Sequence, residues 1–400
     1  MIESRLLHRL LAIFFLPFLI FIRLISPFYT IRLKTFLSTR IGHYISDAGI
    51  SLCEKIDGMQ YKDIYWFKTP SSNTQLDKMV RRVFFVRWWV RYLILANDLF
   101  PSLKLVPVSE GWRNGRDVRG LYFKTRDIKE AYLPFSQNEE AEAKQFLKHL
   151  GIGDSDKFVC LITRDSEYLS KFFPKWEWAY HNYRDTDIHT YKEAVEALAN
   201  LGYWVFRMGK KVKEPLRINH PRVIDYANLE MRSDLLDIWL PAKAYFSIST
   251  SVGLDAVPQA YRRPVVYVNA MTNADFRSHD HCIWASKNLM WESQAGNLLT
   301  LKETLLNNFR NSEEYKEKGI KIIDLSSEQI REIVLEMESR LTGNWRATEE
   351  EELNQSKFIK IISSWKSKEP EMHGFFHPEA RVSQKYLEYN SSFLSDDKSL

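Results

Sequence analysis

The sequence predicts an α/β protein with two doubly wound domains and an N-terminal membrane-associating helix. Three observations lead to this fold class. Short apolar runs alternate with helical patterns through the second half of the chain, which is typical of parallel sheets covered by helices. The length of 400 residues is sufficient for two domains of ordinary size. An unbroken apolar run also covers residues 10–22 near the N-terminus.

The predicted domain boundaries follow changes of pattern along the chain. Residues 1–29 form the membrane-associating segment, and residues 30–153 form the first sheet domain, which ends in a glycine-containing turn. Residues 154–345 form the second sheet domain, where strand and helix patterns alternate most regularly. Residues 346–400, rich in Glu, Lys and Ser, are expected to form a C-terminal helix and tail.

The composition argues against several classes of function. The net charge of +5 is mild for a chain of this size, so no nucleic-acid partner is expected. The three cysteines, Cys53, Cys160 and Cys282, are scattered and form no Cys-x-x-Cys pair. This spacing argues against a disulfide framework and a cysteine-based zinc site, and it favours a reducing compartment.

The apolar run of residues 10–22 is the first basis for a membrane contact. A helix of that length is about 20 Å long, which is short of the roughly 30 Å hydrocarbon core of a bilayer. Pro17 interrupts the run, and no small-residue cleavage site follows it. We therefore expect the segment to lie in a membrane surface. A buried first helix is the alternative.

Residues 80–95 are the second basis, because arginines alternate with large aromatic side chains there. Arginines attract anionic head groups, and tryptophans favour the interfacial layer. Arg87 and Arg91 are four residues apart and are expected to share one face of a helix. Binding of single-stranded nucleic acid and a packed helix with acid-paired arginines are the alternatives.

Predicted strands and helices alternate along both halves of the chain. In the first half we expect strands at 30–36, 63–67 and 103–108 and a helix at 138–150. In the second half we expect strands at 158–162, 203–206, 222–225, 245–248 and 264–269. The helices between them are expected at 188–201, 232–239 and 253–261. Ligands of such sheets bind beyond the carboxyl ends of the strands.

Those carboxyl ends carry residues suited to an anion. Arg164, Arg207 and Lys210 follow two of the predicted strands. Another strand runs into a small-residue loop whose candidate ligands are Ser249, Thr250, Ser251 and Gly253. Hydroxyl groups, a glycine and a helix N-terminus are typical of a phosphate or diphosphate site. The alternative is an ordinary capped helix.

Other chemistries lack their motifs. No Gly-x-Gly-x-x-Gly follows the early strands, and no P-loop is present, so neither dinucleotide redox chemistry nor ATP hydrolysis is expected. No Gly-x-Ser-x-Gly elbow is present, so serine hydrolysis is not expected. His279, His281 and Cys282 are too close in sequence to surround one zinc ion easily. We expect no metal site.

Several sequence blocks together resemble a family of bacterial glycosyltransferases associated with surface-polysaccharide loci. The resemblance covers about residues 30 to 345 and is most specific between 160 and 270. The blocks that carry it are residues 40–43, 73–76, 164–168, 183–188, 202–209, 224–226, 232–234 and 250–258. The last block reads Thr-Ser-Val-Gly-Leu-Asp-Ala-Val-Pro.

The resemblance implies a GT-B fold, in which two Rossmann-like domains face a central cleft. It also implies that the second domain binds a nucleotide-sugar donor and the first domain binds a glycan or lipid-linked acceptor. Arg164, Arg207 and Lys210 would neutralise the leaving diphosphate without a metal ion, and no cofactor is expected. Asp255 would hold a ribose hydroxyl. His43 is the candidate general base, with Asp47 one helical turn later as the alternative.

The expected partners are the nucleotide sugar, the acceptor and the inner-membrane surface, with the chain peripheral on its cytoplasmic face. Two other functions stay open. A nucleotide-sugar epimerase or hydrolase of the same fold would act on soluble substrates and would release its product without an acceptor. A non-catalytic membrane-associated scaffold would bind no nucleotide sugar.

Overall fold

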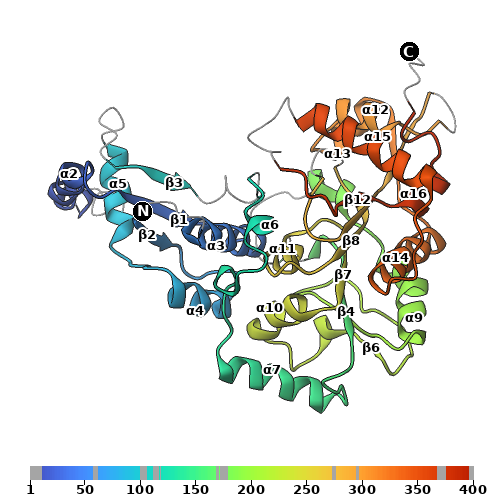
Figure 1. Cartoon of the computed structure of the whole chain (residues 1–400), viewed down its shortest axis with the longest axis horizontal. Coiled ribbons are helices and arrows are strands. Elements are labelled where there is room, and N and C mark those ends of the chain that lie inside the picture. The colour runs from blue at the N-terminus through green and yellow to red at the C-terminus, as the bar shows by residue number, and fades with distance from the viewer. Residues whose placement is uncertain are drawn as a thin grey trace. The chain divides into compact units, whose positions relative to one another are not determined.

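The computed structural model describes residues 11–56, 62–99, 106–110, 117, 119–167, 171, 179–272, 276–293, 297–366 and 375–395. The chain divides into two compact units (Figure 1). The smaller unit holds residues 1–117 and 124–140, and the larger unit holds residues 118–123 and 141–400. Along the described residues, no helix combines the length and apolar character needed to cross a bilayer.

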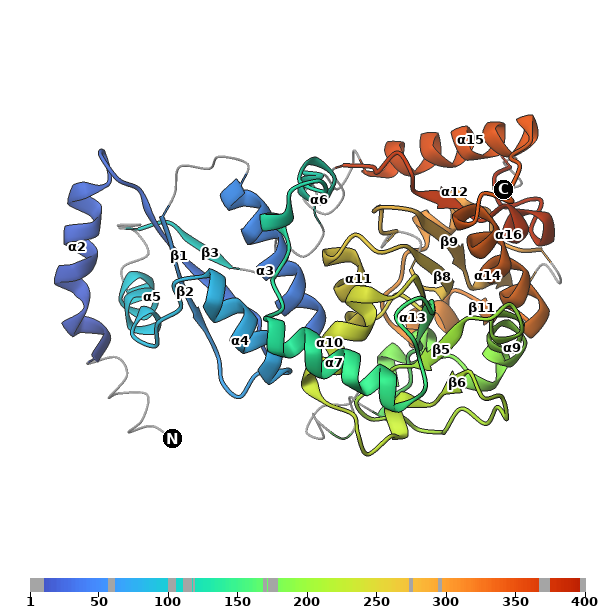
Figure 2. The same cartoon turned by 60° about the horizontal axis from the view of Figure 1, so that its bottom comes forward.

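The smaller unit is built on a parallel sheet of three strands. These strands, in the order β2-β1-β3, are β1 (Ile31–Phe36), β2 (Lys62–Phe67) and β3 (Val108–Glu110). Helices α3 (Ile41–Ile56) and α4 (Thr74–Val83) lie on one side of the sheet. Helix α5 (Val90–Leu99) lies on the other side, and α2 (Leu16–Ile25) packs outside it (Figure 2). Residues 103–105 of the third predicted strand lie outside the described residues.

The two faces of β1 carry different kinds of side chain, because successive side chains of a strand point to opposite sides of the sheet. Leu33 is buried in an apolar cluster with Val90, Leu93 and Ala96. Its neighbour Lys34 is buried on the opposite face, where its Nζ donates to Ser51 Oγ at 3.2 Å and pairs with Glu54 and Asp63. The buried ammonium group is therefore compensated by two carboxylates.

The prediction that Arg87 and Arg91 share one face of a helix is wrong. Helix α4 ends at Val83, and α5 begins only at Val90. Between them the chain is extended, since the amide of Arg87 donates to the Tyr65 carbonyl oxygen at 3.0 Å and the Tyr65 amide donates to Phe85. Phe84 and Val86 are buried, whereas Phe85 and Arg87 are exposed, which is a strand pattern of period two. Arg87 and Arg91 therefore do not share a helix face.

The larger unit is built on a parallel sheet of seven strands in the order β12-β9-β8-β7-β4-β5-β6 (Figure 1). Its strands are β4 (Phe158–Ile162), β5 (Trp204–Arg207), β6 (Val223–Ile224), β7 (Phe246–Ser249), β8 (Val265–Ala270), β9 (Cys282–Ser286) and β12 (Arg381–Val382). The first five lie close to predicted strands, whereas no strand is predicted where β9 and β12 lie. A two-stranded antiparallel sheet pairs β10 (Asn288–Trp291) with β11 (Ile320–Ile323).

Further helices and short 3-10 turns follow α5 along the chain. They are α6 (Leu121–Lys124), η2 (Lys129–Ala131), α7 (Gln137–His149), η3 (Ala179–Arg184), η4 (Ile188–Tyr191), α9 (Lys192–Asn200), η5 (Tyr226–Asn228), α10 (Asp234–Lys243), η6 (Gly253–Asp255), α11 (Ala256–Ala260), α12 (Leu301–Leu306), α13 (Ser312–Glu317), α14 (Ser327–Leu341), α15 (Glu349–Lys366) and α16 (Gln384–Tyr389). The η2 turn belongs to the smaller unit.

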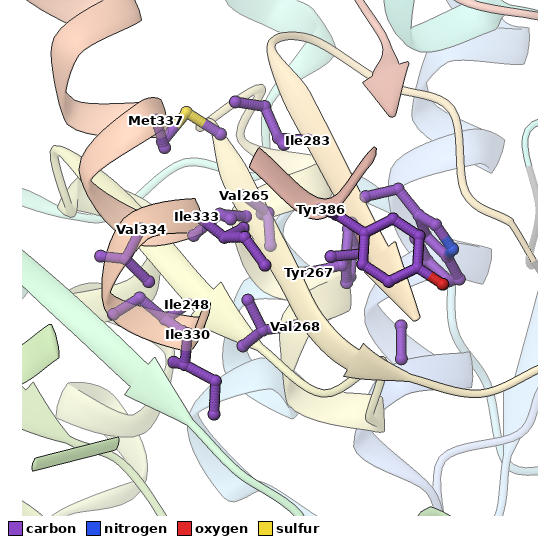
Figure 3. Packing of buried hydrophobic residues seen from close by; sticks show 14 of the residues in the cluster. Ile248, Val265, Tyr267, Val268, Ile283, Ile330, Ile333, Val334, Met337 and Tyr386 are labelled. Carbon is purple, nitrogen blue, oxygen red and sulfur yellow. The ribbon is translucent and has the colours of Figure 1, made fainter. Parts of the chain in front are cut away.

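The main core of the larger unit lies between its sheet and helices such as α14 (Figure 3). The apolar positions of α14 recur every three or four residues, so they form one face of the helix. Ile330, Ile333, Val334 and Met337 are all essentially inaccessible to solvent on that face. Figure 3 shows them beside Ile248, Val265, Val268 and Ile283, side chains of the sheet.

The C-terminal region completes the larger unit. Helix α15 lies in the predicted helical part of residues 346–400, but the residues after it form strand β12 and helix α16 rather than a separate tail. Strand β12 pairs in parallel with β9 at the edge of the sheet. The buried carboxylate of Glu336 accepts hydrogen bonds from the Ser383 hydroxyl at 2.6 Å and the Lys385 amide at 3.0 Å. The sheet edge is therefore closed by residues near the end of the chain.

Candidate functional site

The candidate site lies where the strand order of the large sheet reverses. From β4 the chain proceeds through β5 to β6 on one side, and it continues through β7, β8 and β9 on the other. Strands β4 and β7 are therefore neighbours whose following loops leave the sheet in opposite directions. In open parallel sheets, a ligand-binding crevice forms beyond the carboxyl ends of such a strand pair.

Hydrogen bonds join the loops that follow β4 and β7. The amide of Arg164 donates to Thr250 Oγ1 at 3.0 Å, and the amide of Thr250 donates to the Ile162 carbonyl oxygen at 3.3 Å. The sequence places Arg164 and Thr250 at separate strand ends, 86 residues apart. The fold therefore brings two of the predicted site residues into direct contact.

The turn after β7 uses most of its own hydrogen-bonding groups. The amide of Ser251 donates to Ser249 Oγ at 3.2 Å, and the amide of Val252 donates to Asp255 Oδ2 at 2.8 Å. With the Thr250 amide also bonded to β4, three N–H groups expected to bind an anion are satisfied inside the protein. Gly253 is exposed at the start of η6. The predicted continuous helix from 253 to 261 is a 3-10 turn followed by the short helix α11.

Asp255 organises this turn. Its side chain is fully buried, accepts from Ser249 Oγ at 2.8 Å and pairs with Arg277 Nη1 at 2.6 Å. Burial raises the pKa of this carboxyl, while Arg277 acts in the opposite direction. Both side chains therefore make hydrogen bonds inside the turn, and the roles of Asp255 as a ribose ligand and Ser249 as a phosphate ligand stay predictions.

Ser251 differs from its neighbours in the turn. Its backbone is left-handed, with φ of 60°, and its side chain is buried. The Oγ atom of Ser251 has no hydrogen-bond partner among the described residues. A buried hydroxyl without a partner is costly in free energy. A hydrogen bond from this hydroxyl to a ligand would break no hydrogen bond among the described residues.

Arg184 is a site residue that the sequence does not reveal. It ends η3, and its Nη2 donates to the carbonyl oxygen of Ser251. Arg164 lies on the β4 side of the same turn, and its Nε donates to Asp185 Oδ1 at 3.0 Å. Arg184 thus contacts the turn that holds Ser251 through its guanidinium group, and Arg164 contacts it through its backbone amide. Residues 183–188 belong to the blocks that carry the family resemblance, and that is the only signal for Arg184 in the sequence.

Lys287 is a second residue that the sequence does not reveal. It follows β9 and is almost fully buried, with its Nζ 2.5 Å from the Asp185 carbonyl oxygen and 2.7 Å from Asp324 Oδ1. It therefore fixes the position of Asp185, the residue that holds the Arg164 guanidinium. Lys287 therefore affects the Ser251 turn indirectly, through Asp185 and Arg164.

Arg207 is buried between acidic side chains. Its side chain is 1% exposed, with Nη1 3.4 Å from Asp225 Oδ1 and Nη2 3.8 Å from Asp165 Oδ2. These two carboxylates compensate its positive charge, and its role as a diphosphate ligand stays a prediction. Lys210 is more accessible, and its Nζ lies 3.4 Å from Asp234 Oδ1.

The two candidate bases lie in the smaller unit on α3, which follows β1. His43 is partly exposed in the first turn of that helix, and Asp47 is fully buried one turn later. The Leu37 amide donates to Asp47 Oδ2 at 3.4 Å, whereas Asp47 Oδ1 has no partner among the described residues. Burial raises the pKa of Asp47 to about 7. Both residues therefore lie near the carboxyl end of β1.

One group of possible metal ligands occurs in the described part of the larger unit. Atoms of Asp280, His377 and Glu379 lie within 4.8 Å of one another. However, the Glu379 amide donates to His377 Nδ1 at 3.1 Å, which leaves the proton of the neutral ring on Nε2. Nε2 is the atom that faces Asp280, and a protonated nitrogen cannot coordinate a metal. These contacts favour a His–Asp pair over metal binding.

No family model matches the chain, and no curated protein matches it. Several solved structures resemble it at low sequence identity. A glycosyl transferase family 9 protein from Veillonella parvula DSM 2008 is 12% identical, covers 79% of this chain and 98% of its own, and has a TM-score of 0.48. The E. coli heptosyltransferase WaaC with ADP is 12% identical, with coverages of 61% and 89% and a TM-score of 0.33. A UDP-N-acetylglucosamine 2-epimerase is also 12% identical, with coverages of 80% and 98% and a TM-score of 0.29. These likenesses are too distant to assign a function, so the function is inferred from this chain's own residues.

Proposed function

We propose that this chain is a glycosyltransferase that moves a sugar from a nucleotide-sugar donor to a glycan or lipid-linked acceptor of a bacterial surface polysaccharide. The observation that carries the proposal is the buried, unpartnered hydroxyl of Ser251 in a turn bordered by Arg164 and Arg184. A hydroxyl donor and guanidinium groups match the acceptor oxygens of a diphosphate. The sequence blocks that resemble surface-polysaccharide glycosyltransferases support the same class of substrate.

In such a transfer, the bond between the anomeric carbon of the sugar and the diphosphate oxygen breaks, and the acceptor hydroxyl oxygen bonds to that carbon. Negative charge develops on the departing diphosphate. Arg164 and Arg184 would stabilise this charge, so the proposed reaction does not require a metal ion. The proton of the acceptor hydroxyl would pass to a base, for which His43 and Asp47 are the candidates.

The donor site can be tested with a matched pair of serine variants. Ser251 and Ser247 are both buried with an Oγ that has no partner among the described residues, but Ser247 lies inside β7. We expect Ser251→Ala to leave the melting temperature of the free protein unchanged and to weaken binding of the nucleotide sugar by about 10- to 100-fold. That loss corresponds to one hydrogen bond to a charged group, about 1.5–3 kcal/mol. Thermal-shift titration with a panel of nucleotide sugars measures both quantities.

Ser247→Ala is the control and should bind the donor like the unaltered protein. Equal donor affinity in the two variants would show that Ser251 does not contact the ligand. If no nucleotide sugar raises the melting temperature of the unaltered protein, a non-catalytic scaffold is favoured. Release of a modified or free sugar without any acceptor would instead favour an epimerase or hydrolase.

A further inference from the structure

Residues 11–28, which include helix α2, have apolar side chains on two sides, and one side packs against other described residues of the smaller unit. On this inner side Ala12 and Leu19 are fully buried, and Phe15 stacks on Tyr92 of α5 with ring centroids 5.7 Å apart. Other apolar side chains of the same segment are exposed. We call these exposed residues, together with Trp88 just before α5, the outer patch: Phe14, Phe18, Phe21, Leu24, Phe28 and Trp88.

The residues of the outer patch are strongly exposed. Phe28 is 91% exposed, and Leu24 and Trp88 are each 70% exposed. Rings connect α2 to Trp88, because Trp88 packs edge-on against Tyr92 at 6.0 Å and Tyr92 stacks on Phe15, which contacts Phe14 and Phe18. Large exposed apolar patches of this kind mark sites of interaction.

The sequence segments that carry the patch contain basic residues and no acidic ones. Arg23 is exposed near the end of α2, and Arg87 is exposed next to Trp88. No aspartate or glutamate occurs between Glu3 and Asp47, or between Asp77 and Asp98. The surface is therefore both apolar and cationic, with a tryptophan at its margin. Anionic lipid head groups complement this charge, and interfacial tryptophan suits the head-group layer.

The length of α2 determines how this helix can contact a bilayer. Its ten residues span about 15 Å, half of the roughly 30 Å hydrocarbon core. A second copy of the chain is a poorer occupant, because a two-fold contact through the patch would bring like-charged arginines together. We propose that the outer patch inserts into one leaflet of an anionic phospholipid bilayer, with α2 lying in the interface and the smaller unit above it.

The proposal does not depend on the reaction that the chain performs, and it can be tested with the full-length protein and no nucleotide sugar. We expect the protein to co-sediment with vesicles of phosphatidylcholine and phosphatidylglycerol, and less with phosphatidylcholine alone. Phe21→Glu with Leu24→Glu should reduce the partition coefficient at least tenfold. Both side chains are exposed, so circular dichroism and the melting temperature should be unchanged.

Leu306→Glu is the matched control, since Leu306 is 71% exposed but lies on α12 of the larger unit. It should bind vesicles like the unaltered protein. Arg23→Gln with Arg87→Gln should lower binding to the anionic vesicles about 30-fold, from roughly fivefold for each arginine, and should reduce the dependence on salt.

Three outcomes would overturn the proposal. The first is an unaltered protein that binds neither type of vesicle. The second is an equal loss of vesicle binding in Leu306→Glu. The third is a dimer in light scattering that the Phe21→Glu and Leu24→Glu changes convert to monomers without affecting vesicle binding, which would assign the patch to self-association.

Discussion

Asp47 links burial in the smaller unit to a measurable dependence of stability on pH. Burial raises its pKa to about 7, compared with about 3.9 for an exposed aspartate. Between these values the folded protein binds more protons at this site than the unfolded chain does. The free energy of unfolding should therefore decrease as pH rises from about 4 to about 7, and this contribution should change no further above that range.

We expect Asp47→Asn to remove this dependence. At pH 8 the variant should be more stable than the unaltered protein, by up to about 4 kcal/mol, and near pH 4 the two should be similar. Urea denaturation at both pH values measures the difference, and His43→Gln on the same helix is the control. A variant that is less stable at pH 8 would contradict the assignment. If Asp47 is also the base, transfer should fall at least 100-fold in the same variant.

Arg207 gives a second expectation, because its removal leaves Asp165 and Asp225 without their cation. We expect Arg207→Ala to lower the free energy of unfolding by about 3–5 kcal/mol, which is typical of a broken buried ion pair. Chemical denaturation measures this cost. Lys210→Ala, which removes a partly exposed pair, should cost about 1 kcal/mol or less. If Arg207→Ala is as stable as the unaltered protein but no longer binds the donor, Arg207 contacts the donor directly.

At the scale of single residues, the sequence predicts which strand ends carry polar groups but not which of these groups are already paired. Arg164 and Arg207 both follow a strand and have the same chemistry. Only the fold brings Asp225 to Arg207 and Thr250 to Arg164. For the same reason Arg184 is not apparent in advance, since its contact with Ser251 joins residues 67 positions apart.

At the scale of elements, the C-terminal strand and helix make a specific contribution to the larger unit. Phe393 and Tyr386 are buried there and meet edge-on with ring centroids 5.0 Å apart. We expect Phe393→Ala to destabilise the protein by about 3–5 kcal/mol, because it removes a buried ring and leaves a cavity. Calorimetry or urea denaturation measures this loss.

Leu353→Ala is the control for that measurement, since Leu353 is exposed on α15. It should change the free energy of unfolding by less than about 0.5 kcal/mol. If both variants behave alike, residues 375–395 are not an integral part of the unit.

The elements differ in how well local pattern identifies them. Strand β4 is a continuous apolar run, and its predicted and observed bounds are the same. The prediction for residues 80–95 is wrong because an arginine-rich aromatic segment has no clear hydrophobic period. The pairing of Val86 with Tyr65 determines its conformation instead. Strand β12 is two residues long, which is too short for any pattern, and its pairing with β9 depends on the completed sheet.

At the scale of the whole molecule, alternation of pattern is enough to predict two α/β units. The predicted boundary at 153/154 differs from the observed division, in which residues 141–153 join the larger unit and residues 118–123 join it as well. Composition cannot locate the points where the chain passes from one unit to the other, because these depend on contacts such as that between Phe146 of α7 and Tyr226, with ring centroids 6.0 Å apart. These two residues are too far apart in the sequence for a local pattern to predict their contact.

The position of β12 has a consequence for synthesis in the cell. A ribosome delivers the chain from its N-terminus at about 5–20 residues per second, so the smaller unit emerges first and can fold early. The edge strand β12 follows all other strands of the large sheet in the sequence. Until residues 381–382 have been synthesised, β9 lacks its neighbour on that side, and a chain truncated before β12 exposes an unpaired strand edge that can pair with other chains.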